Sequence, residues 1–133
     1  MVTPSNPWDI RSKMWLEIEG RPVIGEGRLA ILEAIDRRRS MLEASHETGI
    51  PYRRLRGAIR DMEHVLGHRL VITHRGGVDG GRSELTAAGL ELLKSFKALT
   101  VGFRDETDHR FGRFADTFGK RLALSANRHT EET

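Results

Sequence analysis

Residues 40–66 read SMLEASHETGIPYRRLRGAIRDMEHVL, and this stretch decides the fold. Ser40 precedes Glu43 by three residues, the spacing of a capping box, which predicts that a short helix begins after Ser40. Gly49 can supply the left-handed residue that ends this helix. Pro51 suits the first turn of a further helix, because a backbone N–H at that position would have no partner. The stretch therefore predicts two helices joined by a tight turn.

The second of these helices has two chemically different faces. Leu55, Ile59, Met62 and Leu66 recur at helical spacing and predict a buried stripe. Four arginines fall within residues 53–60, which contain no acidic residue, and most of them point away from that stripe. Such a basic patch is typical of a phosphate-binding surface. A solvated helix face is the simpler alternative for any run of charges, and the flanking elements favour the binding surface.

The residues before this stretch predict one strand and one helix. Residues 1–12 contain two prolines and read as a loose N-terminal arm. Residues 13–19 alternate apolar and polar side chains and predict a half-buried strand. Residues 20–25 hold two glycines and a proline and are expected to turn the chain. Residues 26–38 repeat leucine, isoleucine and alanine at helical spacing and predict a helix.

The residues after the stretch predict a β-hairpin. Residues 69–74 form a short apolar strand, residues 75–82 a glycine-rich reversal with a flexible basic tip, and residues 83–85 the returning strand. Two helices followed by a hairpin give the order of a winged helix-turn-helix, in which the second helix enters the major groove of DNA. The predicted fold class is mainly α with a small β-hairpin wing, namely a winged helix-turn-helix plus a long C-terminal dimerisation helix.

Seven residues are candidates for DNA binding in this arrangement. Arginine makes bidentate bonds to guanine edges and grips phosphates, and tyrosine reaches a base or the backbone. The candidates are Tyr52, Arg53, Arg54, Arg56 and Arg60 on the second helix, and Arg75 and Arg82 on the wing. Double-stranded DNA is the expected partner.

The C-terminal part predicts amphipathic helices. Thr86 is expected to cap a long helix, a polar break is expected at residues 104–110, and a second helical segment should follow. An apolar stripe of this length must bury its face, so we expect a homodimer, with packing on the winged domain as the alternative. The residues assigned to dimerisation are Leu92, Leu93, Phe96, Leu99 and Phe103. Phe111, Phe114 and Phe118 would extend that interface or bind another protein.

The predicted organisation has four parts. Residues 1–12 are the arm, residues 13–86 the winged helix-turn-helix domain, residues 87–126 the C-terminal dimerisation helices, and residues 127–133 a disordered tail. At 133 residues the chain is expected to hold one compact domain with an appended helix.

The composition excludes several classes of site. The chain has no cysteine, which excludes disulfides, thiolate metal sites and cysteine nucleophiles, and makes a reducing cytoplasm the expected location. The sequence has no apolar run near the roughly 18 to 20 residues that a spanning helix needs, so no membrane partner is expected. The net charge of +3 is modest, and its local distribution carries more information than its total.

Two other patterns resemble those of a nucleotide-binding or metal-binding site. Gly76 and residues 81–83 have the spacing of a P-loop with arginine in place of its lysine, but the parallel sheet that a P-loop needs is not predicted. His64, His68 and His74 lie close enough in sequence to suggest a metal or oxyanion sensor, although surface or DNA-facing histidines are the favoured interpretation. The chain is predicted to have no catalytic residue, metal or cofactor, and is not expected to be an enzyme.

Five short motifs stand out along the chain: GEGR at residues 25–28, LEAI at 32–35, GIPYRR at 49–54, GGVDGG at 76–81 and LTAAG at 85–89. Over roughly residues 13–104 they resemble the N-terminal domain of the molybdate-dependent transcriptional regulator (ModE) family. The LTAAG motif is shared with the related LysR-type DNA-binding domains.

This resemblance implies a homodimeric transcriptional regulator that binds a partly palindromic operator, with the helix after Thr86 providing much of the dimer contact. The sequence departs from the family at Pro51, where the family has serine, and at Ala44-Ser45, where it usually has two alanines. Arg56 and Gly57 stand where the family often has bulkier or acidic residues. The operator sequence therefore does not transfer.

The resemblance also bears on sensing. In the family, a pair of small β-domains after the dimerisation helix binds molybdate or tungstate, and this chain is expected to lack them. Residues 124–128 resemble the opening of the first such domain, either as a remnant or by chance. A separate effector or protein partner is then expected. The alternative function is a protein-interaction module that uses a winged fold and an aromatic C-terminal helix without specific DNA binding.

Overall fold

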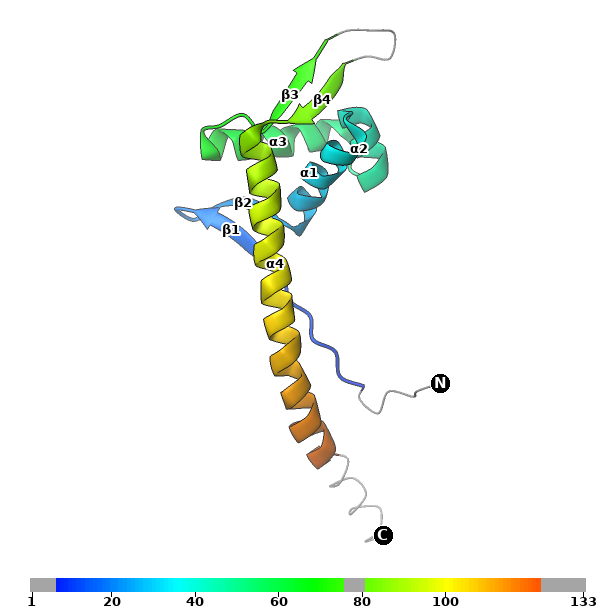
Figure 1. The fold of residues 1–133 in the computed structure, drawn as a ribbon, viewed down its shortest axis with the longest axis vertical. Helices are drawn as coiled ribbons and strands as arrows, with labels where there is room; N and C mark the ends of the chain where they lie inside the picture. Colours follow the sequence, from blue (N-terminus) through cyan, green and yellow to red (C-terminus); the bar gives the residue numbers. More distant parts are fainter. Residues whose placement is uncertain (1–6, 76–80, 123–133) are drawn as a thin grey trace. The chain divides into compact units, whose positions relative to one another are not determined.

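The computed structural model describes residues 7–75 and 81–122. It is mainly helical, with two small antiparallel hairpins and one long C-terminal helix (Figure 1). The chain forms two compact units, Lys13–Leu99 and the combination of Met1–Ser12 with Thr100–Thr133. The tip of the predicted wing, the segment with the sensor-like motif and the predicted tail lie outside the described residues.

The elements follow one another in the order β-β-α-α-α-β-β-α, and a π-helical turn follows the last helix. Their bounds are β1 (Trp15–Ile18), β2 (Arg21–Gly25), α1 (Glu26–Arg38), α2 (Met41–Thr48), α3 (Tyr52–Leu66), β3 (Val71–His74), β4 (Arg82–Leu85), α4 (Ala87–Phe114) and η1 (Ala115–Gly119).

The two caps predicted for α2, Ser40 and Gly49, are confirmed. The Ser40 hydroxyl accepts a hydrogen bond of 3.1 Å from the Glu43 backbone N–H, which starts α2. Gly49 ends α2 and Gly67 ends α3, and both have positive φ, which glycine adopts without steric cost. These local signals fix the boundaries of both helices.

The N-terminal hairpin corrects two predictions. The first strand was expected to be half-buried, but all four residues of β1 are exposed, because no other element covers either of its faces. Residues 20–25 were expected to turn the chain, but β2 occupies most of them and pairs antiparallel with β1. The turn is confined to Glu19 and Gly20, which both have positive φ. Pro22 is compatible with β2 because both strands of a two-stranded sheet are edge strands, where proline is found.

The long C-terminal helix corrects another prediction. A break was expected at residues 104–110, but α4 continues through them without interruption. The polar residues there are compatible with an exposed helix, and Glu106 pairs with Arg110 at 2.8 Å, one turn apart. Polarity alone therefore does not end a helix that contains no proline.

The core of the Lys13–Leu99 unit draws on every helix of that unit. Its fully buried side chains include Leu32 and Ile35 of α1, Leu55 and Met62 of α3, and Phe96 of α4. Burial of these side chains is the main stabilising contribution, at about 1.5 to 3 kcal/mol for each large apolar residue.

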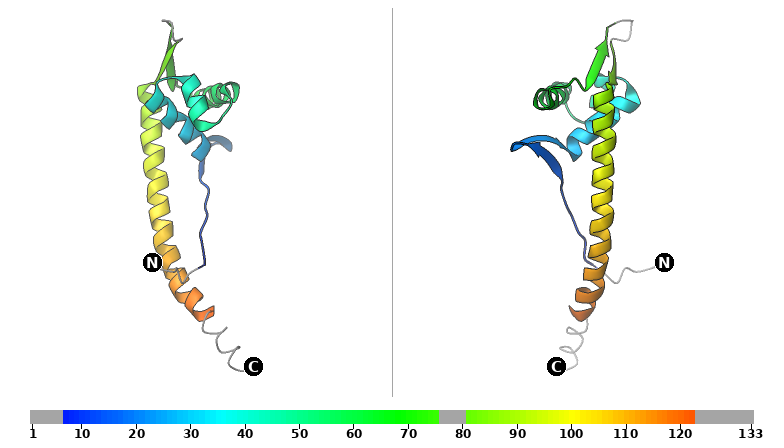
Figure 2. Two further views of the ribbon diagram at one scale, coloured as in Figure 1. Left: turned by 90° about the vertical axis from the view of Figure 1, so that its right-hand side faces the viewer. Right: turned by 60° about the vertical axis from the view of Figure 1, so that its left-hand side comes forward.

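The β3–β4 hairpin is tied at its base to the start of α4. Its register pairs Val71 with Leu85 and His74 with Arg82. The Thr86 hydroxyl accepts a bond of 3.0 Å from the Gly89 N–H and donates one of 2.6 Å to the carbonyl of residue 69, so it both caps α4 and holds the base of β3. Figure 2 shows the first turns of α4 beside the base of this hairpin.

None of the helices among the described residues is long and apolar enough to cross a lipid bilayer.

Candidate nucleic-acid interface

Helix α3 has the two faces that its sequence predicts. Leu55, Ile59 and Met62 are buried in the core, at 4% exposure or less. Arg53, Arg54, Arg56 and Arg60 are all exposed. The buried stripe fixes the rotation of the helix, so the arginines must face outward.

The arginines of α3 have no carboxylate partner, unlike five other arginines of the same unit. No described carboxylate lies within ion-pair distance of any of the four, nor of Arg75 or Arg82. The paired arginines of the unit are Arg28 with Asp61 at 2.7 Å, Arg37 and Arg38 with Glu47, Arg39 with Glu84 at 3.4 Å, and Arg69 with Glu63 at 3.6 Å. The unpaired arginines can therefore bind an anionic partner without first breaking an ion pair.

Tyr52 contacts one of these arginines through its aromatic ring. The Arg56 guanidinium lies 5.8 Å from the centre of the Tyr52 ring, a cation–π contact across one helical turn. Tyr52 itself is 40% exposed, so the pair forms part of the surface at the start of α3.

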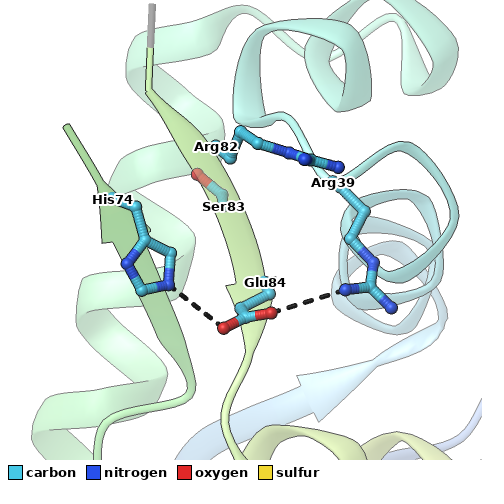
Figure 3. Close-up of a pocket in the computed structure, with 5 residues that line it drawn as sticks. All are labelled: Arg39, His74, Arg82, Ser83 and Glu84. Atoms are coloured by element: carbon cyan, nitrogen blue, oxygen red, sulfur yellow. Dashed lines mark hydrogen bonds and ion pairs between the residues drawn. The ribbon is translucent and has the colours of Figure 1, made fainter. Parts of the chain in front are cut away.

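The hairpin carries the other two candidate residues. Arg75 is exposed just beyond β3, and Arg82 is exposed at the start of β4. Arg82 lines a small pocket between the hairpin and the end of α1, together with Arg39, His74, Ser83 and Glu84. In Figure 3 the Arg82 side chain extends toward Arg39, and no bond is drawn from it to Glu84. Glu84 instead accepts from His74 at 3.1 Å and from Arg39 at 3.4 Å.

Arg39 is a residue that the sequence analysis missed. Its φ of 56° is left-handed, it ends α1, and its carbonyl accepts a bond of 3.0 Å from the Ser83 N–H. This backbone bond and the Arg39–Glu84 pair hold the hairpin against the end of α1. The three consecutive arginines at residues 37–39 indicate a basic segment, but nothing in the sequence near them indicates this contact with residues 83 and 84.

A polar hollow lies between α3 and the hairpin. Arg56 and Arg60 line it from α3, and Thr73 lines it from β3. Arg69 also lines it and was likewise missed, because only the fold brings it beside α3. Glu63 also lines the hollow, and its Oε2 atom accepts bonds from the Leu70 N–H at 2.7 Å and from the Val71 N–H at 3.3 Å.

The residues assigned to dimerisation divide into two groups. Leu93 and Phe96 are buried in the core of their own chain, at 7% and 1% exposure, and Leu92 is half-buried. Leu99 and Phe103 are exposed, at 48% and 46%. The first part of the predicted stripe therefore packs in the core of its own chain, as the alternative interpretation expected. Only Leu99 and Phe103 of the five residues remain exposed.

An aromatic cluster occupies the unit formed by the two ends of the chain. The rings of Phe114 and Phe118 stack at 5.3 Å between centroids, and Trp8 contacts them edge-on at 5.6 and 6.1 Å. Phe111 joins the cluster through Phe114 at 6.2 Å. Trp8 was missed because it lies in an arm without any periodic pattern.

The histidines are dispersed over the molecule. His64 and His68 are exposed, and His74 bonds to Glu84. Among residues 7–75 and 81–122, no group of three or more potential ligand side chains is arranged to hold a metal ion. Gly76 of the P-loop-like spacing lies outside the described residues.

Comparison with known proteins finds relatives whose names refer to molybdenum. No model of a known protein family matches the chain. It is 26% identical over 108 residues to the molybdenum transport protein ModE of Azotobacter vinelandii. It is 32% and 33% identical, over 84 and 79 residues, to the molybdenum-pterin-binding proteins MopA and MopB of Rhodobacter capsulatus.

These similarities are weak in identity and partial in extent. The matches cover 81%, 63% and 59% of this chain but only 40%, 32% and 29% of the relatives, so the chain spans less than half of their length. They support a ModE-related chain, in agreement with the resemblance in the sequence. The names of the relatives describe transport and binding proteins.

Proposed function

We propose that this chain is the DNA-binding part of a ModE-like transcriptional regulator and acts as a homodimer on a partly palindromic operator. In this proposal α2 and α3 form a helix-turn-helix, α3 enters the major groove, and the β3–β4 hairpin is the wing. The observation that carries the proposal is the set of four exposed arginines on α3 without a carboxylate partner, in a unit in which five other arginines are paired with carboxylates.

The electrostatics support this role for α3. Most of the affinity of a protein for DNA comes from cationic side chains that neutralise phosphates and release counterions. Arg53, Arg54 and Arg60 have no competing carboxylate among the described residues and keep their full charge for this purpose. The Tyr52–Arg56 contact limits the side-chain freedom that Arg56 would lose on binding.

The attachment of the hairpin supports its role as a wing. A wing must hold a fixed position relative to the groove-binding helix. The Ser83–Arg39 backbone bond and the Glu63 bonds to the start of β3 connect the hairpin to α1 and to α3. Arg75 and Arg82 then stand at the free end of the described strands, where phosphate contacts are proposed.

The proposed dimer uses α4. Leu99 and Phe103 are exposed apolar side chains one turn apart on that helix, and a second copy would cover them. A dimer would match the proposed partly palindromic operator, since each half of a two-fold symmetric protein would bind one half-site.

The test is a titration of fluorescent duplex DNA at about 50 and 200 mM salt. We expect the double variant Arg53→Ala/Arg60→Ala to lose most of the affinity and to flatten the plot of log K against log salt by about 0.9 for each lost phosphate contact. The matched control is Arg37→Ala, which removes an arginine that is paired with Glu47 and should bind as the wild type does. Equal affinity and slope for the double variant and the control would contradict the proposal.

A second candidate function is a protein-interaction module. The observation that favours it is the exposed aromatic cluster, in which Trp8, Phe114 and Phe118 are each at least 40% exposed. This function predicts no DNA affinity at low salt, so the same titration separates the two candidates.

A further inference from the structure

Gly57 lies in the interior of α3, among the arginines of its exposed side. Glycine destabilises a helix interior relative to alanine, because it loses more backbone freedom on folding. A contact that excludes a Cβ would be a physical reason for glycine at this position.

The fold of the described chain does not supply that reason. A Cβ added to Gly57 meets no heavy atom within 4 Å, and the residue is not among those with positive φ. Gly81 and Gly89 are required by their neighbours: a Cβ on Gly81 lies 2.6 Å from the His74 carbonyl oxygen, and one on Gly89 lies 2.3 Å from that of Leu70. The helical glycines Gly27, Gly102 and Gly112 share the open surroundings of Gly57, but none of them lies among the unpaired arginines of α3. An alanine would fit at position 57 and strengthen the helix.

The surroundings of Gly57 point to a partner outside the chain. Arg53 is one turn before Gly57 and Arg60 nearly one turn after it, so both lie on the same face of α3. The glycine thus leaves a gap between the side chains of the unpaired arginines, and the helix backbone is exposed there. Glycine commonly serves where backbone must approach a ligand closely.

We infer that Gly57 is the point of closest approach of α3 to the base edges of DNA, and that its missing side chain sets how deeply the helix enters the major groove. This inference rests on the proposed function. Arg53 and Arg60 reach the DNA on either side of the gap. A side chain at position 57 lifts the helix away from the bases while leaving longer arginine contacts to phosphates in place, so Gly57 is a specificity-determining position.

The inference predicts opposite effects on stability and on specific binding. Gly57→Ala should raise the melting temperature by about 2 to 8 °C, because the helix interior gains alanine without a clash. The same variant should weaken binding to the tightest duplex that wild-type protein selects from a random-sequence library by about tenfold, the size of one disturbed base contact. Gly57→Leu should weaken it further. Affinity for a duplex of unrelated sequence should stay within about twofold for both variants, because phosphate contacts dominate it.

The matched control is Gly27→Ala. Gly27 is exposed near the start of α1, and a Cβ there also meets nothing within 4 Å. This variant should bind the selected duplex as the wild type does. If wild-type protein binds no duplex at all, the proposed function fails. If wild-type protein selects a duplex, and Gly57→Ala and Gly57→Leu bind it as tightly as the wild type does, only the inference about Gly57 is overturned. A fall in the melting temperature of Gly57→Ala would overturn the premise that the space around Gly57 is open.

Discussion

Gly89 shows at the scale of one residue how a missing side chain joins two elements. It is buried in the first turn of α4, and its N–H donates to the Thr86 hydroxyl. A Cβ at this position would lie 2.3 Å from the carbonyl oxygen of Leu70, which is backbone and has little freedom to move. The close approach of α4 to the base of β3 therefore requires glycine.

Replacement of Gly89 tests this packing. Gly89→Ala should lower the free energy of unfolding by about 1 to 3 kcal/mol, the usual cost of overpacking. The control Gly102→Ala, at a position of α4 where a Cβ meets nothing within 4 Å, should raise it by about 0.5 to 1 kcal/mol. Urea denaturation monitored by circular dichroism measures both values. Equal stability of the two variants would show that α4 does not pack on β3 in this way.

Residue-level prediction from the sequence succeeded where the signal was local. The spacing of Leu55, Ile59 and Met62 was sufficient to predict which side of α3 is buried. Arg39 and Trp8 were missed because their roles depend on partners far along the chain, Ser83 and the C-terminal phenylalanines. No periodic pattern encodes such contacts.

Helices α1 and α2 are joined by a charged contact at the scale of elements. Glu47 of α2 accepts from Arg37 and from Arg38 of α1, the latter at 2.9 Å. The hydrogen bond from Arg37, followed by that from Arg38, holds the pKa of Glu47 below its ordinary value. Because the folded-state pKa is lowered, the contribution to stability is present above the unfolded pKa of about 4.3 and is lost as the pH falls through the lower folded value.

A comparison of Glu47→Gln with the wild type tests this contact. The wild type should be the more stable protein at neutral pH, and its advantage should shrink as the pH falls below about 4.3. Thermal melts across that range measure the difference. An advantage that grows on acidification would have the wrong sign for a carboxylate with a lowered pKa.

The elements were predicted well where a local signal is strong. Ser40 and Gly49 mark the ends of α2, and the apolar repeat of α1 predicted its bounds of Glu26–Arg38 without a side-chain cap. Strand β2 was overlooked because Pro22 argues against a central strand, whereas this strand lies in a two-stranded sheet. The break expected in α4 was wrong because exposed charged residues are compatible with a helix.

At the scale of the whole molecule, the proposed dimer predicts that one exposed side of α4 is needed for dimerisation and the other is not. Phe103→Asp should convert a dimer to a monomer in sedimentation equilibrium, because it places a charge in an apolar interface. Val101→Asp is the control, since Val101 is as exposed as Phe103, at 49% against 46%, but lies on the other side of α4. A monomeric wild type, or dissociation by both substitutions, would contradict an interface centred on Phe103.

The central claim is that the arginine face of α3 reads DNA as part of a dimer. The most direct measurement is footprinting of the fragment that the wild-type protein selects from genomic DNA of its source, repeated with Arg53→Ala. The account predicts a protected inverted repeat with wild-type protein and none with the variant. Binding that is blind to sequence, vanishes at about 0.2 M salt and is the same for both proteins would contradict it.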